Sequence, residues 1–279
     1  MVENNNGIWA RIKPIFHTYT FEIKRHIKAF IIFSIIGNAI CILTNFVLSM
    51  SIPEQSINAS EMSFLRSGLS FISLLILFAA CLFFSALIVG EYSKETGLIV
   101  FPKINKYKLA LGKYLGNLTL VVLIVAQFYF FLGLFSLYFY GGSLPVQFYV
   151  SFGMALLYVL CLSGFVSFFS SFMTSVNMTI VSTILLLFIG FDIITQIIGL
   201  LYPRIEPLWS FSYLGGLITQ VVQEEFPQDI SDRYIDMNIQ GFLFRTWITP
   251  SIEMGVSLML LYMAVFFSLA MTIFSRKQI

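Results

Sequence analysis

Six long apolar stretches constrain this chain more than any other feature of its sequence. Each exceeds the roughly 20 residues that a helix needs to cross the hydrocarbon core of a bilayer, and none alternates as a barrel strand of about 9–11 residues would. The stretches are residues 30–50, 67–90, 114–140, 148–172, 178–201 and 252–274. The sequence therefore predicts an all-α polytopic protein of the cell (cytoplasmic) membrane, with one transmembrane domain over residues 1–279.

The composition excludes an ordinary soluble domain. Apolar residues make up 58% of the chain and charged residues 11%, against roughly 45–50% and about 25% in soluble domains. No cleavable signal peptide is expected, because the first apolar run begins only after Lys28. Cys41, Cys81 and Cys161 all lie in apolar runs, so we expect neither disulfides nor a metal site. The net charge of +2 gives no reason to expect nucleic acid as a partner.

The distribution of positive charge predicts how the six spans are oriented. Twelve of the 16 Lys and Arg residues lie before the first span, between the second and third, or after the sixth, and four lie in the other connections. An excess of Lys and Arg is typical of cytoplasmic connections. We therefore expect both the N-terminus and the C-terminus in the cytoplasm.

Two segments outside the spans carry an apolar pattern of their own. In residues 1–29, apolar side chains such as Ile12 and Phe16 recur at helical spacing opposite a basic face. The pattern predicts an amphipathic helix in the membrane interface, and packing against protein is the alternative. Residues 202–251 contain an apolar portion, 208–222, that is too short to cross. It predicts an extracytoplasmic segment with a re-entrant or interfacial helix pair that caps the outer end of a pathway.

One ionisable residue, Asp192, lies well inside a span. Asp192, Thr195, Gln196 and Gly199 share one face of the predicted fifth helix. A carboxylate at this depth must face protein or water. One interpretation is a polar patch that lines a pathway, and the other is a group that joins helices through a hydrogen bond to a neighbour. The sequence leaves both interpretations open.

No enzyme activity is expected, because the candidate catalytic residues do not assemble into a site. His17 and His26 lie in the amphipathic segment, and the acidic residues 224–225 lie in an outer loop. Gly112-Lys113 is not a phosphate-binding loop, since neither Ser nor Thr follows the lysine. We therefore expect this chain itself to bind no ATP, no other cofactor and no metal.

The connection between the second and third spans, residues 91–113, combines charge with an apolar patch. Leu98, Ile99 and Phe101 form this patch in a polar segment that breaks at Pro102. Apolar surface surrounded by charge commonly marks a protein contact. Insertion of the same side chains into the bilayer interface is the alternative.

Motifs in this connection resemble those of permease subunits of ATP-binding-cassette (ABC) transporters of the type-2 exporter class, the ABC-2 family. The shared pattern is a Glu, a Glu-Thr-Gly turn, a Leu, a Pro and a Gly-Lys pair: Glu91, Glu95, Thr96, Gly97, Leu98, Pro102, Gly112 and Lys113. Lys94 departs from it, because many members have an acidic residue or Gly there. Six spans, a polar residue in the fifth and a long outer segment make the chain similar to the NosY-like branch.

The resemblance implies that residues 91–113 are a coupling segment that docks on a separate ABC ATP-binding subunit, with residues 170–177 as a lesser second contact. The coupling interface would consist of Glu91, Glu95, Thr96, Gly97, Leu98, Phe101, Pro102 and Lys113. The resemblance also implies a second permease copy, identical or related, in the working unit. ATP and Mg would be bound by the partner ATPase.

Two other classes of function stay open from the residues alone. An ATP-independent secondary carrier or channel would use Asp192 as its ion-coupling group, with Thr195 and Gln196 lining the pathway. A membrane anchor or signalling scaffold would transport nothing. The expected function is the transmembrane permease subunit of an ATP-driven exporter, which forms its pathway as a dimer.

Overall fold

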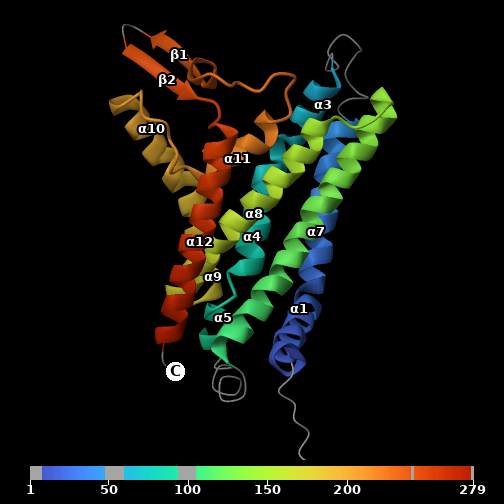
Figure 1. Cartoon of the computed structure of the whole chain (residues 1–279), viewed down its shortest axis with the longest axis vertical. Helices are drawn as coiled ribbons and strands as arrows, with labels where there is room; N and C mark the ends of the chain where they lie inside the picture. Colours follow the sequence, from blue (N-terminus) through green and yellow to red (C-terminus); the bar gives the residue numbers. More distant parts are fainter. Residues whose placement is uncertain (1–7, 48–59, 94–104, 240–241, 278–279) are drawn as a thin grey trace, which may run out of the picture.

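Long apolar helices build the described part of the chain, as the sequence predicts. The computed structural model describes residues 8–47, 60–93, 105–239 and 242–277, and in this part six helical segments are long and apolar enough to span a membrane. They alternate in direction, so the start of α1 (Ile8–Ile42) and the end of α12 (Ile252–Arg276) lie at one end of the bundle (Figure 1). We call this the inner end and the opposite end the outer end, following the predicted orientation.

The other four spans are built from one or more helices each. They are α3 (Glu61–Gly68) with α4 (Ile72–Phe84) and α5 (Val89–Ser93), α7 (Lys106–Tyr140), α8 (Val146–Phe172), and α9 (Val176–Leu185) with α10 (Phe191–Leu201). A wide π-helical turn, Leu186–Gly190, joins α9 to α10. Such turns insert an extra residue into a helix and are frequent at functional sites.

The predicted amphipathic helix (1–29) and first span (30–50) form one helix in the described part of the chain. α1 continues without a break from Ile8 to Ile42. Thr18 and Glu22 on this helix are buried, whereas Ile12 and Phe16 are exposed. The structure therefore shows this segment packed along α7, and its position relative to a membrane interface stays a prediction.

Small residues on α7 allow α1 to pack closely along it. A Cβ atom added to Gly112 would lie 2.7 Å from the Cβ of Thr18 and 2.8 Å from the carbonyl oxygen of Ile15. A Cβ on Gly116 would lie 3.2 Å from the carbonyl oxygen of Tyr19. Small residues four apart let membrane helices approach until their backbones touch. The glycine of the Gly112-Lys113 pair thus has a packing role within this chain.

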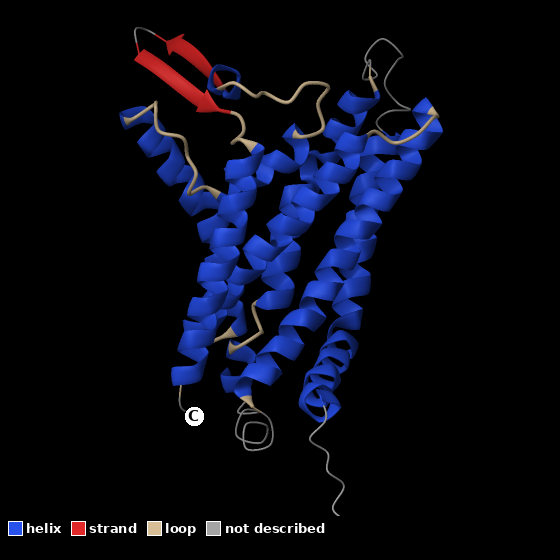
Figure 2. Ribbon diagram, in the orientation of Figure 1, coloured by secondary structure: helices blue, strands red, loops and turns tan. Residues whose placement is uncertain are grey.

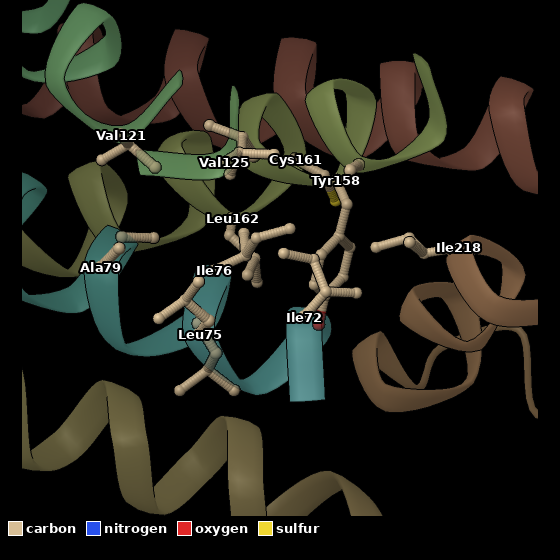
Figure 3. Packing of buried hydrophobic residues seen from close by; sticks show 14 of the residues in the cluster. Ile72, Leu75, Ile76, Ala79, Val121, Val125, Tyr158, Cys161, Leu162 and Ile218 are labelled. Carbon is tan, nitrogen blue, oxygen red and sulfur yellow. The ribbon is translucent and has the colours of Figure 1, made fainter. Parts of the chain in front are cut away.

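α8 lies at the centre of the bundle and contacts α4, α7, α11 and α12. Its Tyr158 side chain lies between Ile72 of α4 and Ile218 of α11 (Figure 3). Gly215 makes room for this ring, because a Cβ there would lie 2.9 Å from the Cζ of Tyr158. In a bilayer such close packing, rather than exclusion of water, holds helices together.

The outer segment differs from its prediction. In place of a helix pair it forms one helix, α11 (Phe211–Gln220), and an antiparallel hairpin of β1 (Tyr234–Ile239) and β2 (Phe242–Trp247) (Figure 2). The described chain is all-α in its spans, as predicted, and this two-stranded hairpin is an addition in the outer segment. The cause is visible in residues 234–239, where apolar and polar residues alternate with the period of a strand.

Hydrogen bonds hold the short helix α11 against the bundle. The Ser151 hydroxyl donates to the Ile218 carbonyl oxygen over 2.6 Å and also bonds the Tyr129 hydroxyl over 2.7 Å. Arg66 of α3 donates to the Gln220 side chain over 2.8 Å. The last carbonyl groups of a helix have no partner within it. The Ser151 hydroxyl of α8 gives the Ile218 carbonyl the partner that it lacks within α11. Together with the bond from Arg66, it holds α11 at the outer end.

Candidate functional site

A cleft of about 550 Å³ lies at the outer end, between α10, α11 and β2. Small-molecule sites commonly occupy roughly 300–1,000 Å³. We call it the outer cleft. Its lining includes Asp192, Thr195, Gln196 and Gly199 from α10, Trp209 from the turn before α11, Ser212 and Tyr213 from the start of α11, and Arg245 and Trp247 from β2.

The structure brings together the polar residues that the sequence places on one face. Asp192, Thr195, Gln196 and Gly199 all line the outer cleft. Within the part of the chain that the structure describes, Asp192 accepts no hydrogen bond and forms no ion pair. The interpretation of Asp192 as a helix-joining group needs such a bond to a neighbour. The geometry therefore favours a polar patch that faces a cavity.

Arg245 enters the cleft from the hairpin with its charge already balanced. It lies opposite Asp236 in the strand register and donates two hydrogen bonds of 2.7 Å to that carboxylate. Its guanidinium also covers the Tyr234 ring, 3.5 Å from the ring centroid. The hydrogen bonds from Arg245 hold the pKa of Asp236 below its ordinary value. Arg245 thus joins the two strands of the hairpin, and because Asp236 balances its charge it adds no net charge to the cleft.

The sequence did not predict the residues that complete the cleft. Trp209, Tyr213, Arg245 and Trp247 come from the outer segment and join α10 only through the tertiary fold. The strand alternation of residues 234–239 could have indicated the hairpin. It could not have shown that the hairpin lies beside α10.

At the inner end, Glu91 and Lys113 form a buried ion pair. Glu91 belongs to α5 and Lys113 to α7, and the two residues are 6% and 2% exposed. The prediction placed both in an interface with an ATPase. Their burial within this chain gives them another role, because the pair joins the helices on either side of the connection. The other six residues predicted for the interface, Glu95, Thr96, Gly97, Leu98, Phe101 and Pro102, lie outside the described residues.

Charges on α1 extend this ion pair. Glu22 is fully buried, lies 3.6 Å from Arg25 and 3.2 Å from the His26 ring nitrogen, and interacts electrostatically with Lys113. A buried charge is costly unless partners surround it. The inner ends of α1, α5 and α7 are therefore joined by one group of charges, which we call the inner charge cluster.

Ser170, the first residue of the predicted second contact with an ATPase, is buried instead. Its hydroxyl accepts hydrogen bonds from the backbone N–H groups of Ile88 (3.0 Å) and Val89 (3.2 Å) and donates to the Ser85 carbonyl oxygen (2.8 Å). These groups belong to the break between α4 and α5, where the helical ladder leaves them without partners. Ser170 thus stabilises a bend inside the chain.

Comparisons with known proteins add no relative. No protein-family model matches the chain, and no curated protein matches it. In the part of the chain that the structure describes, no group of three or more His, Cys, Asp or Glu residues could hold a metal ion.

Proposed function

We propose that this chain is the permease subunit of an ATP-driven exporter of the ABC-2 family in the cell membrane. It works with a second permease copy and with separate ATP-binding subunits, which bind ATP and Mg. The observation that supports the proposal most directly is the buried Glu91–Lys113 pair. It fixes both ends of the inner connection to the bundle, so a force on residues 94–104 acts on the spans.

Several contacts link the inner connection to helices farther away in the bundle. Lys113 interacts with Glu22 of α1, and the neighbouring Tyr114 hydroxyl lies 2.8 Å from the Ser163 hydroxyl of α8. Ser170 of α8 in turn holds the bend between α4 and α5. Packed contacts of this kind can switch between two arrangements when a partner binds. The inner end therefore has the connections that coupling to an ATPase needs.

Exposed apolar spans support a second copy in the assembly. Two spans bury few residues within the chain: 6% of the most apolar part of Val176–Leu201 is buried, and 11% of that of Ile252–Arg276. The corresponding share in Glu61–Tyr92 is 78%. The poorly buried spans must contact lipid or protein. A second copy against one of them would enclose a pathway that a single chain leaves open to the bilayer.

Replacing Leu98 and Phe101 together by Glu tests the coupling interface. We expect loss of an ATP-hydrolysing partner from the affinity-purified chain, because two charges would be buried against its apolar groove. The measurement is ATP hydrolysis, and labelling by 8-azido-ATP, of material purified from native membranes. The matched control is Ile235→Glu, at an apolar side chain 53% exposed in the outer hairpin. Undiminished hydrolysis in the Leu98/Phe101 variant would contradict the interface.

An ATP-independent carrier is the second candidate, and Asp192 in the outer cleft is the observation that favours it. Such a carrier would couple transport to an ion that binds this carboxylate. Proteoliposomes that contain the purified chain alone distinguish the two functions. A proton or sodium flux that the chain supports and Asp192→Asn abolishes would favour the carrier and contradict the exporter.

A further inference from the structure

We propose that the outer cleft binds an amphipathic amine that also carries hydrogen-bond-accepting oxygens. That this molecule is the exported substrate rests on the proposed function, whereas binding itself does not. Three properties of the cleft lead to this class of ligand: its charge, its unpartnered donors and its aromatic walls.

The charge of the cleft selects a cation. Asp192 has no ion-pair partner among the described residues, and Arg245 is neutralised by two hydrogen bonds to Asp236. Glu206, next to the cleft, accepts a hydrogen bond of 2.8 Å from Tyr213 and adds a second negative charge. An anionic ligand would be repelled by Asp192 in the lining and by Glu206 beside it. A protonated amine would supply the partner that Asp192 lacks.

Buried donors without partners select a ligand that carries acceptors. The indole N–H groups of Trp209 and Trp247 and the hydroxyl of Thr195 are buried with no hydrogen-bond partner in the described structure, and all three residues line the outer cleft. An indole N–H can only donate. Because native proteins leave few buried polar atoms unpaired, three around one cavity indicate that a bound molecule completes them. Carbonyl, ether or hydroxyl oxygens on that molecule would do so.

The walls of the cleft fit an organic body better than an inorganic ion. Trp209, Tyr213 and Trp247 line it together with Ile198 and Ile205. Aromatic faces attract ammonium groups and cover apolar surface. A metal cation needs several oxygen ligands, whereas Asp192 is the only carboxylate in the lining. A cavity volume of about 550 Å³ accommodates a drug-sized molecule.

Tryptophan fluorescence measures occupation of the cleft directly. The chain contains 3 Trp residues, and Trp9→Phe leaves only Trp209 and Trp247 as reporters. The variant is reconstituted in lipid nanodiscs without any ATPase and titrated with propranolol, a secondary amine with a hydroxyl and an ether oxygen. N-acetylpropranolol, which is neutral but has the same body, is the matched ligand. We expect saturable quenching by propranolol and affinity lower by about tenfold or more for the acetylated form.

Variants assign the binding to the cleft. Asp192→Asn should weaken propranolol binding about tenfold or more, because the charge-assisted hydrogen bond is lost. The matched control Asp229→Asn, an outer carboxylate that does not line the cleft, should change nothing. Trp247→Phe keeps an aromatic ring, though a smaller one, and removes the N–H donor, so it should weaken binding about threefold or more. Unchanged elution from gel filtration verifies that each variant is folded.

Two results would overturn the inference. Quenching that never saturates would show partition into lipid only, and equal affinity of wild type and Asp192→Asn would place the amine elsewhere. The outcome is separable from that of the ATPase experiment. Saturable binding together with absence of an ATP-hydrolysing partner would support the ligand class and contradict the exporter function. Presence of that partner together with absence of saturable binding would contradict the ligand class and leave the exporter function supported.

Discussion

At the scale of single residues, the buried charges of the described part of the chain, Glu22, Glu91 and Lys113, lie close to one another or to other charges. Lys113 illustrates this, since its ammonium group has Glu91 beside it and Glu22 within electrostatic range. Removal of one member of a buried pair leaves the other without compensation, whereas removal of both is much less harmful. The inner charge cluster should therefore respond to mutation as a unit.

Lys113→Met tests this expectation. We expect the free energy of unfolding to fall by roughly 3–5 kcal/mol, because Glu91 would be left buried without its partner. Thermal unfolding in detergent, followed by circular dichroism, measures the change. The double variant Glu91→Leu with Lys113→Met should recover most of the loss, and Lys108→Met, at a half-buried lysine of the same helix, should have little effect. A double variant as unstable as the single one would argue against the cluster.

At the scale of elements, the helices pack closely where glycine allows it. Gly112→Ala should lower the free energy of unfolding by roughly 1–3 kcal/mol, because the new Cβ would overlap Thr18 and the Ile15 backbone of α1. Gly153→Ala in α8 is the control, since a Cβ there meets nothing within 4 Å. That change should be neutral or stabilise the helix by up to about 1 kcal/mol. Equal effects of the two substitutions would show that α1 does not depend on this contact.

The spans were predictable because length and hydropathy alone define them, whereas the starts of the helices that contain them were not. The helix that leads into the second span begins at Glu61, ahead of residue 67, and that of the third begins at Lys106, ahead of residue 114. In both cases a polar cap starts the helix before the apolar run. The side chain of Ser60 accepts from the Ser63 N–H, and that of Asn105 accepts from the Tyr107 N–H.

Of the candidate site, only the residues that share one face of α10 were predictable from the sequence. Asp192, Thr195 and Gln196 are neighbours on α10 by helical period alone. Trp247 comes beside them through a hairpin more than fifty residues later, and no local pattern records that contact. The Gly-Lys motif indicates Lys113 as a contact residue, and only the fold shows that its side chain is buried.

At the scale of the whole molecule, the charge distribution predicts which end faces the cytoplasm. Because Cys41, Cys81 and Cys161 are buried, an impermeant maleimide should react with introduced cysteines alone. We expect Ser231→Cys, at an exposed position beside the hairpin, to be labelled on intact cells. Asn105→Cys, exposed at the inner end, should be labelled only after permeabilisation. Mass shift on a denaturing gel measures both, and the opposite pattern would invert the topology.

The π-helical turn Leu186–Gly190 decides where α10 points. It places one residue more in the turn than an α-helix would, and one residue corresponds to a rotation of about 100°. Without that residue, the face of α10 that carries Asp192 would be rotated by about 100° relative to α11. The direction in which the polar face points thus depends on the number of residues in this turn as well as on which residues they are. Insertion or deletion of one residue in this turn would rotate the polar face relative to α11 while every residue that lines the cleft stays the same.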